Sequence, residues 1–153
     1  MRNKTIYIVN GPNLSHIEYR DPKFYNKNSL FDIENYIKNY LISKNIVNIV
    51  LRFYQSNNEG DIISFLLNNL AEYEALIINP AAFSHYSLAI ADSLEILRRN
   101  KKIVCEVHIS NIFAREEERK RLVTAKNADI IIAGAGIHSY SLALEYILEK
   151  LSI

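Results

Sequence analysis

The alternation of short β-branched runs with amphipathic stretches constrains the fold of this chain more than any other feature of its sequence. Three runs, at residues 6–9, 76–78 and 130–132, are continuously apolar, which is typical of parallel strands that are buried on both faces. We predict five strands in all: Ile6–Val9, Val47–Tyr54, Ala75–Asn79, Lys102–Val107 and Asp129–Ala133.

The segments between these runs show helical periodicity. Ser29, followed by Asp32 three residues later, predicts a capped helix start. The apolar stripes that follow helical spacing are Leu30, Ile33, Ile37 and Leu41; Ile62, Leu66 and Leu70; Ile90, Leu94 and Leu97; and Ala143, Ile147 and Leu151 in a last helix over 139–151. The order βαβαβαβαβα predicts a doubly wound α/β fold, a five-stranded parallel sheet with helices on both faces.

Composition narrows the class of protein. With 153 residues and neither a linker nor an internal repeat, we expect a single domain over 1–153. A formal net charge of +1 lacks the basic excess of a nucleic-acid binder. The single cysteine, Cys105, cannot form an internal disulfide, which fits a reducing compartment. No apolar run approaches the roughly 18–20 residues of a membrane span, so we expect a cytoplasmic protein.

Polar residues gather directly after the predicted strands. In open α/β sheets, ligands bind beyond the carboxyl ends of the strands, so these segments are where a site is expected. They comprise 10–14, 55–60, 79–85, 108–119 and 134–136, and they bring two histidines, several asparagines and two arginines to one edge of the sheet. Packing alone does not require this concentration.

Glu106 and His108 lie two residues apart on a predicted strand, so their side chains point to the same face. A carboxylate beside an imidazole orients the ring and favours its charged form, which suits a general acid. A purely structural pair at a strand end is the alternative. Adding His85 gives two histidines and a carboxylate, the ligand set of a facial metal site, although no further ligand cluster supports that interpretation.

Arg20 and Tyr25 lie five residues apart on the segment after the first strand, which we expect to be a polar loop to about Asn28. A free phenol has a pKa near 10 and is a poor base at neutral pH. One or two guanidinium groups in a partly dry site could supply the roughly 3–4 kcal/mol of phenolate stabilisation that base function needs. The chain has ten tyrosines, so a packing or surface role for Tyr25 is the alternative.

Two further residue pairs are candidates for substrate contacts. Asn13 and Asn79 are neutral donors on loops that follow strands, where turn chemistry also favours asparagine. Arg115 and Arg119, four apart, share a face if their segment is helical. They could clamp hydroxyls or a carboxylate, or merely pair with the acidic residues at 116–118.

Five motifs in this order resemble the type II 3-dehydroquinate dehydratase family over essentially the full length. The motifs are N-G-P-N-L (10–14), R-D-P-x-x-Y (20–25), Q-S-N-x-E-G (55–60), N-P-x-A-x-S-H (79–85) and E-V-H-I-S-N-I-x-A-R-E-E-x-R (106–119). The resemblance implies a flavodoxin-like fold. It also implies that 3-dehydroquinate is converted to 3-dehydroshikimate by anti elimination of water through an enolate, with neither a metal nor an organic cofactor.

The resemblance implies a role for each catalytic position. Tyr25 would remove the proton from C2, next to the ketone, and Arg20 would favour its phenolate. Asn13 would hold a water that stabilises the enolate oxygen, which is an oxyanion-hole role. His108 would protonate the departing hydroxyl, with Glu106 orienting the ring.

Substrate contacts are implied in the same way. Asn79, Ser110 and the backbone amides around Ile109 would hold the substrate carboxylate. His85 and Arg119 would contact the ring hydroxyls.

The remaining implications concern closure and assembly. Arg115 would help to close a lid over the site, and Asp92 would reach the active site of a neighbouring subunit. The family assembles as trimers grouped into a dodecamer, so a homo-oligomer is implied. Biosynthesis of aromatic amino acids through the shikimate pathway is the commoner role in the family, and breakdown of quinate uses the same reaction.

Some positions depart from the family pattern. Glu18 and Asn26 replace glycines around the lid, Ala81 replaces a frequent glycine, and 121–124 lacks the His-Ser often found there. Altered lid residues could slow turnover, so a flavodoxin-like binding module that keeps the pocket without efficient catalysis is an alternative. A flavin-binding relative is a third hypothesis.

Overall fold

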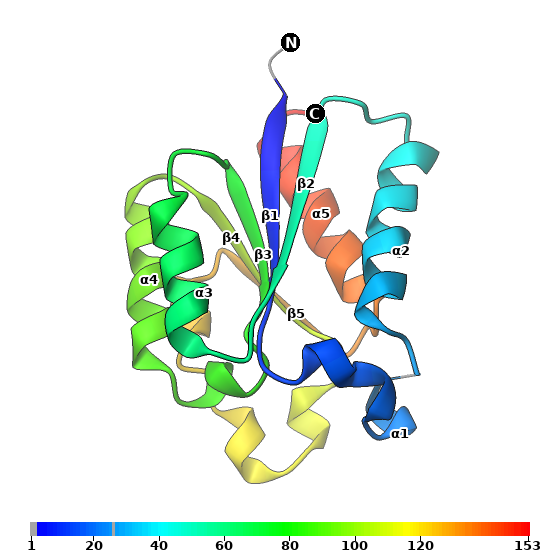
Figure 1. Cartoon of the computed structure of the whole chain (residues 1–153), viewed down its shortest axis with the longest axis vertical. Helices are drawn as coiled ribbons and strands as arrows, with labels where there is room; N and C mark the ends of the chain where they lie inside the picture. The colour runs from blue at the N-terminus through cyan, green and yellow to red at the C-terminus, as the bar shows by residue number, and fades with distance from the viewer. Residues whose placement is uncertain (1–2, 26) are drawn as a thin grey trace.

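The computed structural model describes residues 3–25 and 27–153, which form an open α/β sandwich around one sheet (Figure 1). Five parallel strands lie in the order β2-β1-β3-β4-β5. They are β1 (Lys4–Asn10), β2 (Ile49–Gln55), β3 (Ala75–Asn79), β4 (Ile103–His108) and β5 (Ile130–Ala133). The predicted doubly wound α/β architecture is confirmed.

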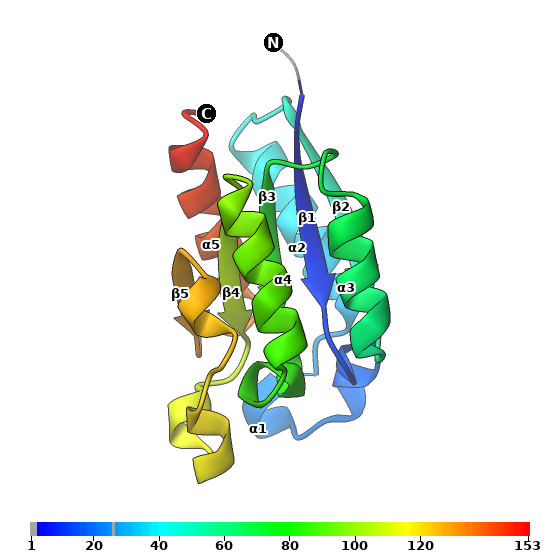
Figure 2. The ribbon, with the colours of Figure 1, turned by 90° about the vertical axis from the view of Figure 1, so that its left-hand side faces the viewer.

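Helices cover both faces of the sheet. Helices α2 (Leu30–Ser43) and α5 (His138–Lys150) lie on one face, and α3 (Glu59–Asn68) and α4 (Leu88–Arg99) lie on the other (Figure 2). The predicted cap of α2 is confirmed, because Ser29 and Asp32 each accept a hydrogen bond from the other's backbone N–H. The backbone N–H and the hydroxyl of Ser29 both donate to the Asp32 carboxylate, and they hold the pKa of Asp32 below its usual value. Within the part of the chain that the structure describes, no helix has the length and apolar character of a membrane span.

Alternating strand side chains build two hydrophobic clusters, one on each face of the sheet. On β1, Ile6 and Ile8 pack toward α2 and α5, whereas Tyr7 and Val9 pack toward α3 and α4. The same alternation continues on β3 and β4. Because every strand runs in the same direction, the strand carboxyl ends meet at one edge of the sheet.

Three sequence predictions about burial and boundaries are wrong in detail. β5 is not buried on both faces, because it is an edge strand and Ile131 is 42% exposed. The second strand does not begin at Val47, which is 90% exposed in the loop before β2. Leu70 lies beyond the end of α3, although it still packs against the core.

The segment expected as a polar loop after β1 is folded. A 3₁₀ segment (Leu14–Tyr19) leads into the short helix α1 (Pro22–Tyr25), which lies beyond the carboxyl ends of the strands (Figure 1). Leu14, Ile17 and Tyr25 are buried against the core on the α2–α5 side. These apolar residues are too few and too irregularly spaced to show a periodicity in the sequence.

Gly11 allows the loops after β1 and β3 to approach one another closely. Its backbone N–H donates to the carbonyl of Asn79 at 2.8 Å. A Cβ at position 11 would lie 2.4 Å from the carbonyl oxygen of Pro80. Only glycine therefore fits here, and the contact places Asn79 beside the loop that leads to Tyr25.

Candidate active site

A pocket of about 320 Å³ opens at the carboxyl edge of the sheet, where the segments after β1, β3 and β4 converge. The pocket is lined by Leu14, Arg20, Tyr25, Asn79, Ala81, His85, His108, Ile109, Ser110, Ile112, Arg115 and Arg119. Most of the site residues predicted from the sequence are thus brought together.

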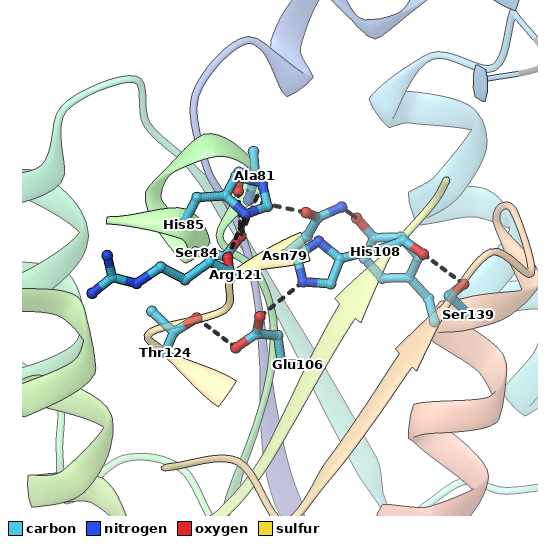
Figure 3. A network of polar contacts seen from close by, with 10 residues as sticks. Asn79, Ala81, Ser84, His85, Glu106, His108, Arg121, Thr124 and Ser139 are labelled. Atoms are coloured by element: carbon cyan, nitrogen blue, oxygen red, sulfur yellow. Dashed lines mark hydrogen bonds and ion pairs between the residues drawn. The ribbon is translucent and has the colours of Figure 1, made fainter. Parts of the chain in front are cut away.

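His108 ends β4 and is held from below by Glu106. The Nε2 atom of His108 lies 2.8 Å from Oε1 of Glu106, which is fully buried. The second carboxylate oxygen, Oε2, accepts a hydrogen bond of 2.7 Å from the Thr124 hydroxyl (Figure 3). A carboxylate accepts and an imidazole N–H donates, so Nδ1 is the ring nitrogen of His108 left to act on a substrate.

His85 lies beside His108 in the same pocket, with ring centroids 6.4 Å apart. Its Nδ1 is 2.9 Å from the carbonyl oxygen of Arg121, which fixes the ring (Figure 3). Burial lowers the pKa of His85, and the neighbouring Arg119 and His108 add to this effect. A His85 that is neutral at neutral pH is suited to hydrogen bonding with hydroxyls.

Two guanidinium groups contact Tyr25 in different ways. Nη1 of Arg115 donates to the Tyr25 hydroxyl at 2.9 Å, whereas the Arg20 guanidinium lies over the ring, 4.4 Å from its centroid. The sequence called for one or two guanidinium groups beside the phenol, and the family resemblance named Arg20. The structure adds Arg115, and it is Arg115 that contacts the oxygen atom.

Arg115 and Arg119 both line the pocket, but not from one helix. Two separate 3₁₀ turns, Ile112–Ala114 and Glu117–Lys120, flank an extended Arg115. Glu116 forms ion pairs with both arginines, and its pKa falls to about 2, chiefly through a backbone hydrogen bond and then through Arg119. The segment is therefore not one helix and the two arginines do not share a helical face, although both guanidinium groups still line the pocket.

Asn79 forms part of the pocket wall and is held by a buried network. Its Nδ2 donates to the Tyr140 hydroxyl at 3.1 Å, and its Oδ1 accepts from the Ala81 N–H at 3.1 Å. The Tyr140 hydroxyl in turn donates to Oδ1 of Asn10 at 2.6 Å. Asn10 and Asn79 are register partners at the ends of β1 and β3, so a single residue of α5 fixes both amides.

The pocket has a strongly cationic lining that suits an anionic ligand. Arg20 reaches it from the segment after β1, whereas Arg115 and Arg119 reach it from the segment after β4. The Ser110 hydroxyl oxygen lies 3.5 Å from Nη1 of Arg115. The only acidic partner directly beneath the pocket, among the described residues, is Glu106, and both of its oxygens are occupied by His108 and Thr124.

Other predicted residues lie outside the pocket lining. Asn13 is exposed, with its backbone in the left-handed region (φ 65°) and its N–H bonded to Oδ1 of Asn57. Asp92 is exposed on α4. Glu18 is exposed on the 3₁₀ segment after β1, and Asn26 lies outside the described residues.

The facial metal site considered from the sequence is not formed. Glu106 is turned beneath His108 and is bonded to Thr124, so it does not converge with the two histidine rings on a common point. In residues 3–25 and 27–153, no group of three or more His, Cys, Asp or Glu side chains is arranged to hold a metal ion.

Sequence reasoning missed two polar residues that support the site. Thr124 lies in an irregular segment, and no spacing rule links it to Glu106. Tyr140 offered a signal, because it precedes Ala143 and Ile147 at helical spacing and so lies on the buried stripe of α5. A phenol hydroxyl on a buried stripe needs a hydrogen-bond partner.

An acid–base pocket at the carboxyl edge of a doubly wound sheet defines an α/β enzyme that acts on a small anionic molecule. Comparison with known proteins is more specific. The family model described as "Dehydroquinase class II" matches residues 4–148, so the chain belongs to the class II dehydroquinase family.

Individual relatives cover almost the whole chain. It is 42% identical over 148 residues to a 3-dehydroquinate dehydratase of Clostridium botulinum (strain Loch Maree / Type A3), covering 97% of each protein. It is 45% identical over 146 residues to the 3-dehydroquinate dehydratase of Thermotoga petrophila, covering 95% of this chain and 96% of that protein. The crystal structure of the type II dehydroquinase of Butyrivibrio crossotus superimposes with a TM-score of 0.87 at 35% identity, covering 95% of this chain and 97% of that one.

Proposed function

We propose that this protein is a 3-dehydroquinate dehydratase that forms 3-dehydroshikimate by anti elimination of water through an enolate. The observation that carries the proposal is that a candidate base and a candidate acid line one pocket. The candidate base is a phenol bonded to a guanidinium, and the candidate acid is an imidazole bonded to a buried carboxylate. Elimination next to a ketone needs a base at C2 and an acid for the leaving hydroxyl, and the two pairs supply them.

Tyr25 acts as the base. As a phenolate it takes the proton from C2, and the electron pair of that C–H bond forms the enolate. Arg115 at the hydroxyl and Arg20 over the ring stabilise the phenolate by charge attraction, which is strengthened because Tyr25 is only 6% exposed. Asn13, together with a water molecule, stabilises the enolate oxygen, which requires its side chain to turn toward the bound substrate.

His108 acts as the acid in the second half of the reaction. As the enolate collapses, the C1–O bond breaks and the ring donates a proton from Nδ1, so the hydroxyl departs as water. Glu106 keeps Nε2 protonated and the ring oriented. Transfer of a proton from Tyr25 back to His108 through water restores both groups for the next turnover.

The substrate carboxylate is held by neutral hydrogen-bond donors, while the arginines that line the pocket favour its negative charge. Asn79, Ser110 and the backbone around Ile109 hold it, and all three line the pocket. His85 and Arg119 contact the ring hydroxyls. A neutral imidazole and a guanidinium are both suited to hydrogen bonding with a polyol.

Turnover of purified protein tests the proposed function. Incubation with 3-dehydroquinate is expected to produce the ultraviolet absorbance of the conjugated product, at the same rate before and after treatment with a chelator. Loss of activity in chelator would favour a metal mechanism. Calorimetric binding without product formation would favour the catalytically impaired binding module, and a yellow protein as purified would favour the flavin-binding relative.

We also propose that the chain is one domain that assembles into a homo-oligomer, as trimers grouped into a dodecamer. Tyr86, Leu88 and Phe113 support assembly, because these large apolar side chains are exposed near the pocket segments. In such an assembly, Asp92 on the surface of α4 reaches a neighbouring active site. Light scattering measures the assembly, and Asp92→Asn is expected to lower kcat without unfolding the protein.

The cellular setting follows from the proposed reaction. We place the protein in the cytoplasm, in the shikimate pathway of aromatic amino acid biosynthesis. A strain that lacks its own dehydroquinase and requires aromatic amino acids should grow without them when it expresses this chain.

A further inference from the structure

Thr124 lies outside the pocket lining, and its side chain bonds to a carboxylate oxygen of the acid pair. It is fully buried, and its hydroxyl donates to Oε2 of Glu106 at 2.7 Å. The other oxygen of Glu106 is bonded to His108 at 2.8 Å. The three side chains form a continuous line from the 121–124 segment to the ring (Figure 3).

The backbone around Thr124 is anchored on both sides. The Val123 N–H donates to the carbonyl of Ser84 at 2.8 Å. After Thr124, the Asn127 side chain donates to the carbonyl of Ala91 on α4 at 2.6 Å. The hydroxyl is thus held in place by contacts that do not involve Glu106, and a fixed donor can fix the carboxylate that it meets.

Burial makes this bond important for the charge state of Glu106. An ionised carboxylate with no exposed surface is costly unless each oxygen is hydrogen-bonded. His108 satisfies only one oxygen. Thr124 is therefore the donor that lets Glu106 remain an anion whether or not His108 carries its second proton.

We propose that Thr124 is a positioning residue for the acid: its hydroxyl keeps Glu106 ionised and oriented, and Glu106 in turn orients His108. The proposal rests on the proposed dehydratase function. It predicts that loss of the hydroxyl impairs the proton donation by His108 without weakening substrate binding, because Thr124 does not line the pocket.

Thr124→Val removes the hydroxyl and keeps the shape of the side chain. We expect kcat to fall about tenfold, which corresponds to about 1.4 kcal/mol, with KM unchanged. Thr124→Ser, which restores the donor, is expected to recover most of kcat. Ser93→Ala is the matched control, because it removes another buried hydroxyl, bonded to the Ala89 carbonyl within α4, that has no link to Glu106.

The split between kcat and KM separates positioning from a merely structural role. Without the hydroxyl, one oxygen of the buried carboxylate loses its donor and the His108 ring is held less well, so kcat falls while KM is unchanged. A structural role would lower the melting temperature and leave the kcat of the folded enzyme in place.

Several results would overturn the proposal. One is a folded Thr124→Val enzyme with wild-type kcat, and another is a Thr124→Ser enzyme as impaired as Thr124→Val. If Thr124→Val does not fold, Thr124→Cys decides, because a thiol is a weak donor and kcat must fall; full activity in this variant contradicts the proposal.

A readout without substrate separates this proposal from the proposed function. If the wild-type protein does not convert 3-dehydroquinate, the dehydratase assignment fails, but Thr124 can still be tested by NMR of the His108 ring. The Nε2–H signal is expected to be protected in the wild type and in Thr124→Ser, and to be broadened by exchange with water in Thr124→Val. Equal protection in all three proteins would overturn the positioning role.

Discussion

Replacing Arg115 by glutamine removes the cation at the Tyr25 hydroxyl while leaving a side chain that can still donate a hydrogen bond. The two groups are 2.9 Å apart. Unit charges about 4 Å apart attract by about 4 kcal/mol at an effective dielectric of about 20, and hydrogen bonds to charged groups are worth about 1.5–3 kcal/mol. Because the pocket is partly open to water, we expect a loss of about 2.7 kcal/mol, or about a hundredfold in kcat.

The split between kcat and KM makes this prediction specific. The cation assists proton removal by Tyr25 rather than substrate binding, so kcat should fall while KM stays near its wild-type value. Steady-state rates from product absorbance at a series of substrate concentrations provide the measurement. Arg99→Gln is the matched control, because among the described residues Arg99 pairs with Glu95 alone, on the surface of α4.

Two outcomes would refute this reasoning. Activity of Arg115→Gln within twofold of the wild type would mean that the phenolate needs no cation at this position. A rise in KM with kcat unchanged would mean that Arg115 acts on substrate binding rather than on Tyr25.

Three further changes test the surroundings of the site. Tyr140→Phe leaves the buried amides of Asn10 and Asn79 each short of a partner, so urea unfolding should show a loss of about 1–3 kcal/mol; an unchanged midpoint would contradict the network. Ala81 has a left-handed backbone (φ 52°), so Ala81→Gly should relieve about 1–2 kcal/mol of strain. Glycine costs about 0.5–1 kcal/mol of conformational entropy, so the net effect is a small gain in stability. The urea midpoint should therefore rise slightly rather than fall. Because burial lowers the pKa of His85, the unfolded chain binds more protons than the folded one below pH 6.5, and stability falls as the pH drops. His85→Asn should make that fall shallower, and an identical slope in both proteins would show that His85 does not cause it.

The order of strands and helices could be predicted because buried parallel strands and amphipathic helices have different periods. The exposure of Ile131 could not, because a short apolar run looks the same in a central strand and in an edge strand. The burial of Leu14 and Ile17 could not be predicted from the sequence pattern either, since a 3₁₀ segment presents only one or two apolar residues to the core.

The location of the site could be predicted from the topology of the sheet. The hydrogen-bonded pairs within the site could be predicted only in part. Glu106 and His108 are neighbours on a strand, so their pairing could be predicted from the side-chain period of two. Tyr25 and Arg115 are 90 residues apart, and Glu106 and Thr124 are 18 apart across irregular backbone. Such pairs depend on the path of two loops, and neither loop carries a periodic pattern from which that path could be derived.

The most direct test of Tyr25 as the base is the kcat of Tyr25→Phe with 3-dehydroquinate. This change removes the hydroxyl oxygen and keeps the buried ring and its contact with Arg20. We expect kcat to fall by about a thousandfold, within the range that general base catalysis supplies, while the variant still binds the substrate. A Tyr25→Phe protein that keeps a tenth or more of the wild-type rate would show that another group removes the proton from C2.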